Sequence, residues 1–405
     1  MPRDDLEIRA PRADELEPWA AATASAFGTA VDQDELPRFR GYLDPARNLA
    51  AYDGGTPVAT VAAAAFSLSV PGGELPAAGV TEVGVSPAYR RRGILTALMR
   101  RQLDDVRAWG EPLAALQATE AAIYGRYGYG LATRAVSLDV DARRLRLRDG
   151  EDAGHVRLVG HEEALALLPE VYDRARAVTP GFHSRSRGWW EHKTLPDDGD
   201  RPLQRAVLER DGRPQAYALY RVENASPEGF PDGVLHLQEE LACTPDACRQ
   251  LWRWLLAMDL VGRVRAAHVA PDHPLLLLAS EPARLRMRVK DGLFVRLVDV
   301  PAALAGRRYA GDGALTLEVE DGFCGWNAGR WRLAVTDGTA RVEAAGGALA
   351  DLRLDVAALA SAYLGGFTFG DLARAGRVEQ LTAGAIERAS ALFRGEREPF
   401  SPEDY

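Results

Sequence analysis

The first part of the chain alternates apolar and polar positions in a way that predicts helices and strands in turn. Apolar residues recur at helical spacing from Leu95 to Val106, whereas Val80 to Val85 has the character of a strand. Such alternation indicates a mixed α/β fold. The expected elements are a helix over 16–27, a hairpin over 49–65 with an Asp-Gly turn, a strand over 80–85, a helix over 95–106, a strand over 112–117, a short helix over 120–127 and a closing strand over 136–140.

The same order of elements returns later in the chain. A second Asp-Gly hairpin is expected over 206–222, followed by a strand over 235–242 and a helix over 247–260. Asp53, Glu82 and Pro87 recur at one constant spacing as Asp211, Glu240 and Pro245, which indicates a duplicated fold. In the second copy, Cys248-Arg249-Gln250-Leu251 stands where the first copy has Arg90-Arg91-Arg92-Gly93. We therefore interpret the second copy as structural.

Beyond about residue 297 the pattern changes to an antiparallel meander followed by helices. Strands are expected over 315–319, 331–335 and 340–344, and helices over 356–363 and 378–393. The tail from Glu396 to Tyr405 is polar and contains Pro399 and Pro402. The sequence thus predicts an α+β third domain with a C-terminal tail.

Composition excludes several classes of protein. A chain of 405 residues with 47% hydrophobic and 26% charged residues is ordinary for two or three globular domains. The net charge of −9 argues against a nucleic-acid binder. Three cysteines and seven histidines are too scattered for a disulfide framework or a metal knuckle, so we expect no metal. The charged N-terminus and the absence of a long apolar run predict a cytoplasmic protein that does not bind membranes.

The segment from Val85 to Leu95 carries the clearest chemical signal. It joins the end of a strand to the first turn of a helix through three consecutive arginines and Gly93. A glycine at a helix start lets backbone N–H groups approach an anion, and the helix dipole adds about half a positive charge there. Arginines beside those amides suit a pyrophosphate. The alternative is a solvated basic turn.

This unit resembles motif A of the GNAT superfamily of N-acetyltransferases, although Leu95 replaces the usual small last residue. Further similarity lies in Ile123-Tyr124-Gly125-Arg126, Trp326-Asn327-Ala328-Gly329-Arg330 and Tyr363-Leu364-Gly365-Gly366. Over its whole length the chain resembles the enhanced-intracellular-survival (Eis) family of aminoglycoside N-acetyltransferases. The resemblance implies a catalytic GNAT domain over 1–148, a degenerate GNAT-like domain over 149–296 and a sterol-carrier-like domain over 297–405. It also implies acetyl-CoA as cosubstrate and a homo-hexamer built from two trimers.

The resemblance assigns residues to the cofactor and to catalysis. Tyr124 would be the general acid, since a phenol with a pKa of about 10 can protonate a departing thiolate; the alternative is a core tyrosine. The residues expected to bind acetyl-CoA are Val83, Val85, Arg90, Arg91, Gly93, Ile94, Leu95 and Thr119.

The base has two candidates. The resemblance implies the C-terminal carboxylate of Tyr405, which would take the amine proton through water; the alternative for this residue is a frayed terminus. Glu82 is the second candidate, on the strand beside the thioester, unless it simply faces solvent.

An acidic, aromatic substrate pocket is the last expectation. Its members would be Phe27, Asp32, Asp34, Glu35, Phe39 and Asp404, and the alternative is a solvated loop. The sequence therefore predicts an amine N-acetyltransferase acting on aminoglycosides or similar polyamines. A protein lysine acetyltransferase and a lipid-binding scaffold with a vestigial catalytic domain remain as alternatives.

Overall fold

The computed structural model describes residues 6–29, 41–196, 201–226, 229 and 231–403. The described chain forms two compact units, each of which is treated by itself. One unit contains residues from 6–132 and 293–395, and the other contains residues from 133–292 and 396–403. No helix among the described residues is long and apolar enough to cross a bilayer.

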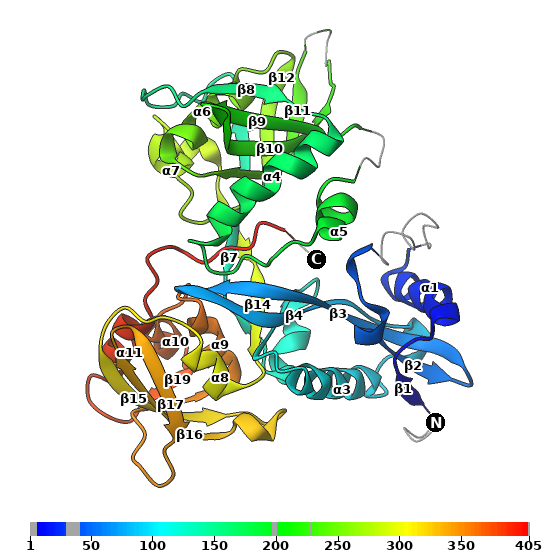
Figure 1. The fold of residues 1–405 in the computed structure, drawn as a ribbon, viewed down its shortest axis with the longest axis vertical. Coiled ribbons are helices and arrows are strands. Elements are labelled where there is room, and N and C mark those ends of the chain that lie inside the picture. Colours follow the sequence, from blue (N-terminus) through cyan, green and yellow to red (C-terminus); the bar gives the residue numbers. More distant parts are fainter. Residues whose placement is uncertain (1–5, 30–40, 197–200, 227–228, 230, 404–405) are drawn as a thin grey trace. The chain divides into compact units, whose positions relative to one another are not determined.

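The first unit contains a seven-stranded mixed sheet (Figure 1). In spatial order its strands are β1 (Glu7–Arg9), β2 (Leu49–Asp53), β3 (Thr56–Val70), β4 (Gly73–Val85), β5 (Leu113–Gln117), β14 (Leu293–Leu297) and β6 (Gly130–Leu131). Helix α3 (Ile94–Ala108) packs on β2, β3 and β4, and its spaced apolar residues Leu98, Met99 and Leu103 are fully buried. Helix α1 (Leu16–Phe27) contacts β3 and β4, where the Thr23 and Thr60 hydroxyls lie 2.8 Å apart.

The same unit holds a second, five-stranded sheet with four helices. Its strands, in spatial order, are β17 (Thr339–Ala344), β16 (Gly329–Thr336), β15 (Gly313–Glu320), β18 (Leu352–Asp355) and β19 (Val378–Gln380). The helices are α8 (Val300–Ala305), α9 (Val356–Tyr363), α10 (Phe369–Arg374) and α11 (Ala385–Phe393). The expected single helix over 378–393 is wrong at its start, because β19 pairs with β18 and Gly384, in the left-handed region, begins α11.

The other unit contains a seven-stranded sheet with a helix on each face (Figure 1). Its strands, in spatial order, are β13 (Arg288–Asp291), β7 (Arg134–Asp141), β12 (Val261–Val269), β11 (Gly233–Ala242), β10 (Arg213–Glu223), β9 (Gln204–Arg210) and β8 (His155–Leu158). Alternate side chains of β10 enter two different cores. Ala218 packs with α6 (Pro245–Leu256), and Tyr217 packs with α4 (His161–Arg176). Two short helices complete the unit, α5 (Arg187–Trp189) and α7 (Leu275–Leu278).

One strand departs from the expected order. The strand expected over 136–140 does form, as β7, but it pairs with β12 and β13 in the other sheet. Its place beside β5 is taken by β14, whose Val295 pairs with Ala115. The duplicated folds are therefore completed by strands from outside their own contiguous segments.

Candidate functional site

The candidate site lies where strands β4 and β5 separate. The two strands pair in parallel only from Ala77 to Gly79, although β4 continues to Val85. A bulge lies beyond this point, with Glu82 in the left-handed region at φ 54° and its carbonyl accepting the Thr60 hydroxyl at 2.9 Å. A pocket of about 720 Å³ lies at the split and is lined by residues 80–85 of β4 and by residues that follow β5.

One end of the pocket is formed by the start of helix α3. After a 3-10 turn over Pro87–Tyr89, Arg91 and Gly93 adopt φ angles of 63° and 80°, and no side chain caps the helix. The first N–H groups of α3 are therefore left for an anion. Arg90 donates to the carbonyls of Ala26 (2.8 Å) and Val85 (3.2 Å), which fixes the loop. The exposed Arg91 has no side-chain partner within the described part of the chain, so its guanidinium can bind a ligand.

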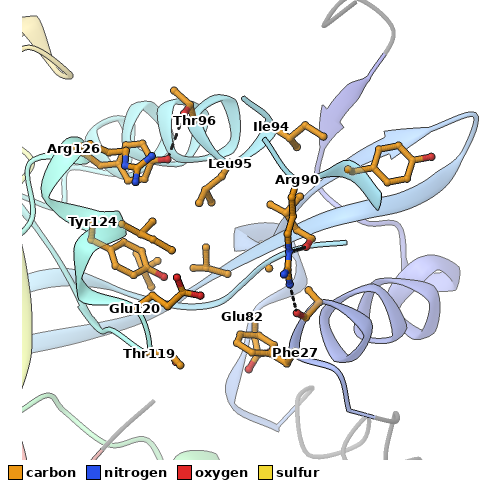
Figure 2. Close-up of a pocket in the computed structure, with 18 of the residues that line it drawn as sticks. Phe27, Glu82, Arg90, Ile94, Leu95, Thr96, Thr119, Glu120, Tyr124 and Arg126 are labelled. Carbon is orange, nitrogen blue, oxygen red and sulfur yellow. Dashed lines mark hydrogen bonds between the residues drawn. The ribbon is translucent and has the colours of Figure 1, made fainter. Parts of the chain in front are cut away.

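The other end of the pocket is formed by a 3-10 helix over Ala121–Tyr127, which presents Tyr124. Figure 2 shows Tyr124 and Glu120 on the opposite side of the view from Arg90 and Ile94. Burial is the main cause that raises the pKa of Tyr124 to about 12, and the neighbouring Tyr127 and Glu120 add to it. The phenol therefore stays protonated across the physiological range and can act as a proton or hydrogen-bond donor.

Glu82 and Phe27 border the pocket near the end of α1 (Figure 2). Phe27 is 52% exposed, so its ring is accessible to a ligand at the rim of the pocket. The close approach of α1 needs a glycine in β4, since a Cβ atom on Gly84 would lie 2.7 Å from the Cβ of Ala26.

The fold brings together all the described residues that the sequence proposed for the site. Those that line this one pocket are Phe27, Glu82, Val83, Val85, Arg90, Arg91, Gly93, Ile94, Leu95, Thr119 and Tyr124. Six other candidates lie outside the described residues, namely Asp32, Asp34, Glu35, Phe39, Asp404 and Tyr405.

Several residues that line the pocket were not predicted as site residues from the sequence. Glu120, Thr96 and Arg126 also line the pocket, and Glu120 contributes to the raised pKa of Tyr124. Thr96 directly follows the predicted residue Leu95, and Arg126 lies two positions after Tyr124, so their proximity was a usable signal. Glu120 directly follows the predicted site residue Thr119, so the same signal applied, although an acidic residue is ordinary at a helix start.

The residues just before the C-terminus are anchored in the second unit. Glu403 accepts a hydrogen bond from the Trp189 indole at 2.8 Å, and Arg185 pairs with both Glu403 (2.8 Å) and Glu239 (2.5 Å). The N–H of Phe400 donates to the Pro180 carbonyl at 2.8 Å, and its ring is buried. The chain is thereby fixed to within two residues of its end.

Comparison with family models identifies three regions. An acetyltransferase (GNAT) domain matches residues 7–132, and a second acetyltransferase (GNAT) domain matches residues 181–297. A sterol carrier protein domain matches residues 300–402. The predicted fold class is confirmed: a mixed α/β chain with two GNAT-type domains and a C-terminal sterol-carrier-like domain.

Relatives match the whole chain. An uncharacterized N-acetyltransferase of Streptomyces avermitilis is 40% identical, over 98% of this chain and 99% of its own. The N-acetyltransferase Eis of Mycobacterium tuberculosis is 36% identical over 80% of each chain. The crystal structure of Eis1 from Mycobacterium abscessus superposes with a TM-score of 0.86 at 31% identity, covering 98% of this chain and all of that one.

Proposed function

Because the chain belongs to the Eis-like N-acetyltransferases, we propose that it transfers the acetyl group of acetyl-CoA directly to an amine within a ternary complex. We further propose that the amine belongs to an aminoglycoside or a comparable small polyamine. This proposal rests on the separation of β4 from β5. The separation opens a pocket that extends from the uncapped start of α3 to Tyr124.

The residues present fit acetyl-CoA. A long, phosphate-bearing ligand needs an anion site at one end and an extended groove at the other, and the pocket contains both. Arg90, Arg91, Gly93 and Ile94 would hold the pyrophosphate. Val83 and Val85 would offer backbone N–H groups to the pantetheine, because β4 has no strand partner on this side beyond Gly79 among the described residues. Leu95 and Thr119 would complete the contacts.

Tyr124 would act on the departing sulfur. Acetyl-CoA supplies a thioester, which is activated toward amines. When the amine nitrogen bonds to the acetyl carbon, the carbon–sulfur bond breaks and the electron pair stays on sulfur. The phenol of Tyr124 is protonated at neutral pH, so it can donate its proton to that thiolate. Burial of the ring in the pocket wall fixes the direction of that donation.

The amine must lose a proton, and two groups can accept it. We propose the C-terminal carboxylate of Tyr405 as the base, with Glu82 as the alternative. The resemblance to the Eis family, which implies a catalytic C-terminal carboxylate, supports the first choice. The position of Glu82 on the pocket wall supports the second.

The substrate is proposed from charge and shape. Phe27 offers an exposed aromatic face at the rim, and Glu82 and Glu120 add carboxylates to the lining. Such walls suit ammonium groups. This surface would be extended by Asp32, Asp34, Glu35, Phe39 and Asp404.

We also propose that the protein forms a homo-hexamer built from two trimers, which a mass measurement in solution would test.

The test is thiol release from acetyl-CoA, followed with a thiol reagent. The full-length enzyme should release CoA rapidly with an aminoglycoside or a linear polyamine, and at a much lower rate without an amine. Mass spectrometry of the product should show one or more added acetyl groups. Faster turnover with a lysine peptide than with any small polyamine would contradict the proposed substrate, and no turnover with either would contradict acetyl transfer.

A further inference from the structure

The second GNAT-type domain has a split of its own. Strands β11 and β12 pair in parallel only as far as Leu237 and Ala266, although β11 continues to Ala242. A pocket of about 260 Å³ lies beyond this point. It is lined by residues of both strands, by the start of α6 and by the tail residues Arg397, Phe400 and Pro402. All of these belong to one unit.

Three potential metal ligands converge in this pocket. The Nε2 atom of His273 lies 2.5 Å from Oε1 of Glu240 and 3.8 Å from Sγ of Cys248. One ligand atom from each residue lies within 4.8 Å of the others. The side chains of Glu240 and His273 are 4% and 10% exposed, and Cys248 is buried. The second carboxylate oxygen of Glu240 is buried without a hydrogen-bond partner among the described residues, so the cluster has an unused ligand atom.

We propose that Glu240, Cys248 and His273 form a zinc site. Thiolate, imidazole and carboxylate are the ligands that Zn²⁺ takes, and three protein ligands leave a fourth position that opens to the pocket. Ideal tetrahedral bond lengths place sulfur and nitrogen about 3.6 Å apart, close to the 3.8 Å between Cys248 and His273. The Glu240–His273 contact must widen by somewhat less than 1 Å, a side-chain adjustment. Two anionic ligands also neutralise the charge of the ion.

The sequence alone did not reveal this site because its ligands come from three separate elements. Glu240 lies on β11, Cys248 on α6 and His273 in the loop before α7. Their spacing matches no metal-binding motif, which is why no metal was expected. The three side chains come together because β12, which precedes the loop of His273, pairs with β11.

Binding requires a defined movement of protons. In the structure the Leu275 N–H donates to Nδ1 of His273 at 3.1 Å, so in the neutral ring the proton is on Nε2, facing Glu240. When Zn²⁺ takes the Nε2 lone pair, that proton must move to Nδ1, and the bond from Leu275 must break. The Cys248 thiol must also lose its proton to solvent, because the thiolate is the form that binds the ion.

The test uses the full-length protein, stripped with a chelator, kept reduced and titrated with Zn²⁺ or Co²⁺. One ion should bind per chain, Co²⁺ should give the thiolate charge-transfer absorption, and Zn²⁺ should raise the melting temperature. Cys248→Ser should lose the absorption and weaken binding at least tenfold. Cys243→Ser is the matched control, because Cys243 borders the same pocket outside the cluster and should leave both signals unchanged.

Two further observations make the outcome decisive. If Cys248→Ser fails to fold, Glu240→Gln keeps the side-chain size and should still weaken Zn²⁺ binding, while the Leu275 amide resonance should shift only when the wild-type site fills. Absence of stoichiometric binding by the folded wild type would overturn the proposal. So would an unchanged Co²⁺ spectrum in Cys248→Ser. Neither result bears on acetyl transfer in the first unit.

Discussion

The two GNAT-type domains share a split strand pair but differ at the helix that follows it. In the first, the 3-10 turn over Pro87–Tyr89 leads through the arginine loop, and α3 begins only at Ile94 without a side-chain cap. In the second, α6 begins at Pro245, the counterpart of Pro87, and Thr244 accepts the Ala247 N–H at 3.1 Å. The stretch that forms the arginine loop before α3 in one domain is thus helical in the other, where a side chain caps the first turn.

The corresponding side chains changed role with the backbone. Arg91 is exposed and has no side-chain partner in the described chain, whereas its counterpart Arg249 is buried, pairs with Asp246 at 2.5 Å and donates to the Glu151 carbonyl. Cys248 stands in place of Arg90, and it faces His273. The pocket shrinks from about 720 Å³ to about 260 Å³. The same scaffold can therefore carry an uncapped helix start beside a large pocket in one copy and a capped helix start beside a small pocket in the other.

The largest expected effect comes from reversing charge in the open loop. Arg91→Glu combined with Arg90→Glu should lower kcat/KM for acetyl-CoA on the order of 10³-fold, because two charge-assisted phosphate contacts become repulsive. Steady-state kinetics and calorimetry of CoA binding would measure it. Arg341→Glu, on an exposed position of β17, is the control for charge. Unchanged kinetics and unchanged CoA binding in the folded double variant would contradict the assignment of the arginine loop to the cosubstrate.

Removing the Tyr124 hydroxyl should have the next largest effect. Tyr124→Phe should lower kcat on the order of 10²-fold at nearly constant KM for acetyl-CoA, since the ring still packs and only the proton is lost. Tyr129→Phe is the matched control: its ring lies 6.0 Å from that of Tyr124, and its hydroxyl is buried without a partner among the described residues. Equal kcat values for the two variants would show that Tyr124 only packs in the pocket wall and is not the general acid.

The pH profile sharpens this prediction. With a pKa of about 12, the folded phenol stays protonated through the range where a free tyrosine ionises, so Tyr124 should not limit kcat up to about pH 11. The unfolded chain has the ordinary pKa of about 10, so stability from this residue is fully present below pH 10 and is lost between 10 and 12. Tyr124→Phe should remove that alkaline loss of stability, as urea unfolding at several pH values would show.

Displacing the chain end should lower activity about tenfold or more, since the base is proposed there. Deleting Tyr405 moves the terminal carboxylate by about 3.3–3.6 Å of chain, and a C-terminal tag moves it farther. Acetyl-CoA affinity and melting temperature should change little, because Phe400 and Glu403 keep their contacts. Glu82→Gln is measured in parallel. A fully active tagged enzyme together with an inactive Glu82→Gln would identify Glu82 as the base.

Local sequence patterns predicted the positions of helices and strands in both domains better than they predicted which strands pair with one another. The helix over 16–27 has the predicted bounds, and the strand over 80–85 lies within β4. The exchange of β7 for β14 was not predicted, because alternation of apolar residues defines a strand but not the sheet that it joins. The arginine loop was predicted from the spacing of glycine and arginines, and Tyr124 and Thr119 were predicted from the family resemblance. The Glu240–Cys248–His273 cluster was not predicted, because it depends on contacts between distant segments.

The smallest expected effect concerns the cap that closes the second helix start. Thr244→Ala removes the acceptor for the Ala247 N–H, so the free energy of unfolding should fall by about 1 kcal/mol in urea. Acetyl-CoA kinetics should not change, because the first pocket has its own helix start and needs no such cap. Thr382→Ala, a loop hydroxyl bonded to Asp351 outside both pockets, controls for loss of a threonine. If Thr244→Ala instead lowered kcat/KM more than tenfold at unchanged stability, the second helix start would belong to the catalytic apparatus. The contrast between an uncapped and a capped helix start would then no longer explain why we assign the cosubstrate to the first domain alone.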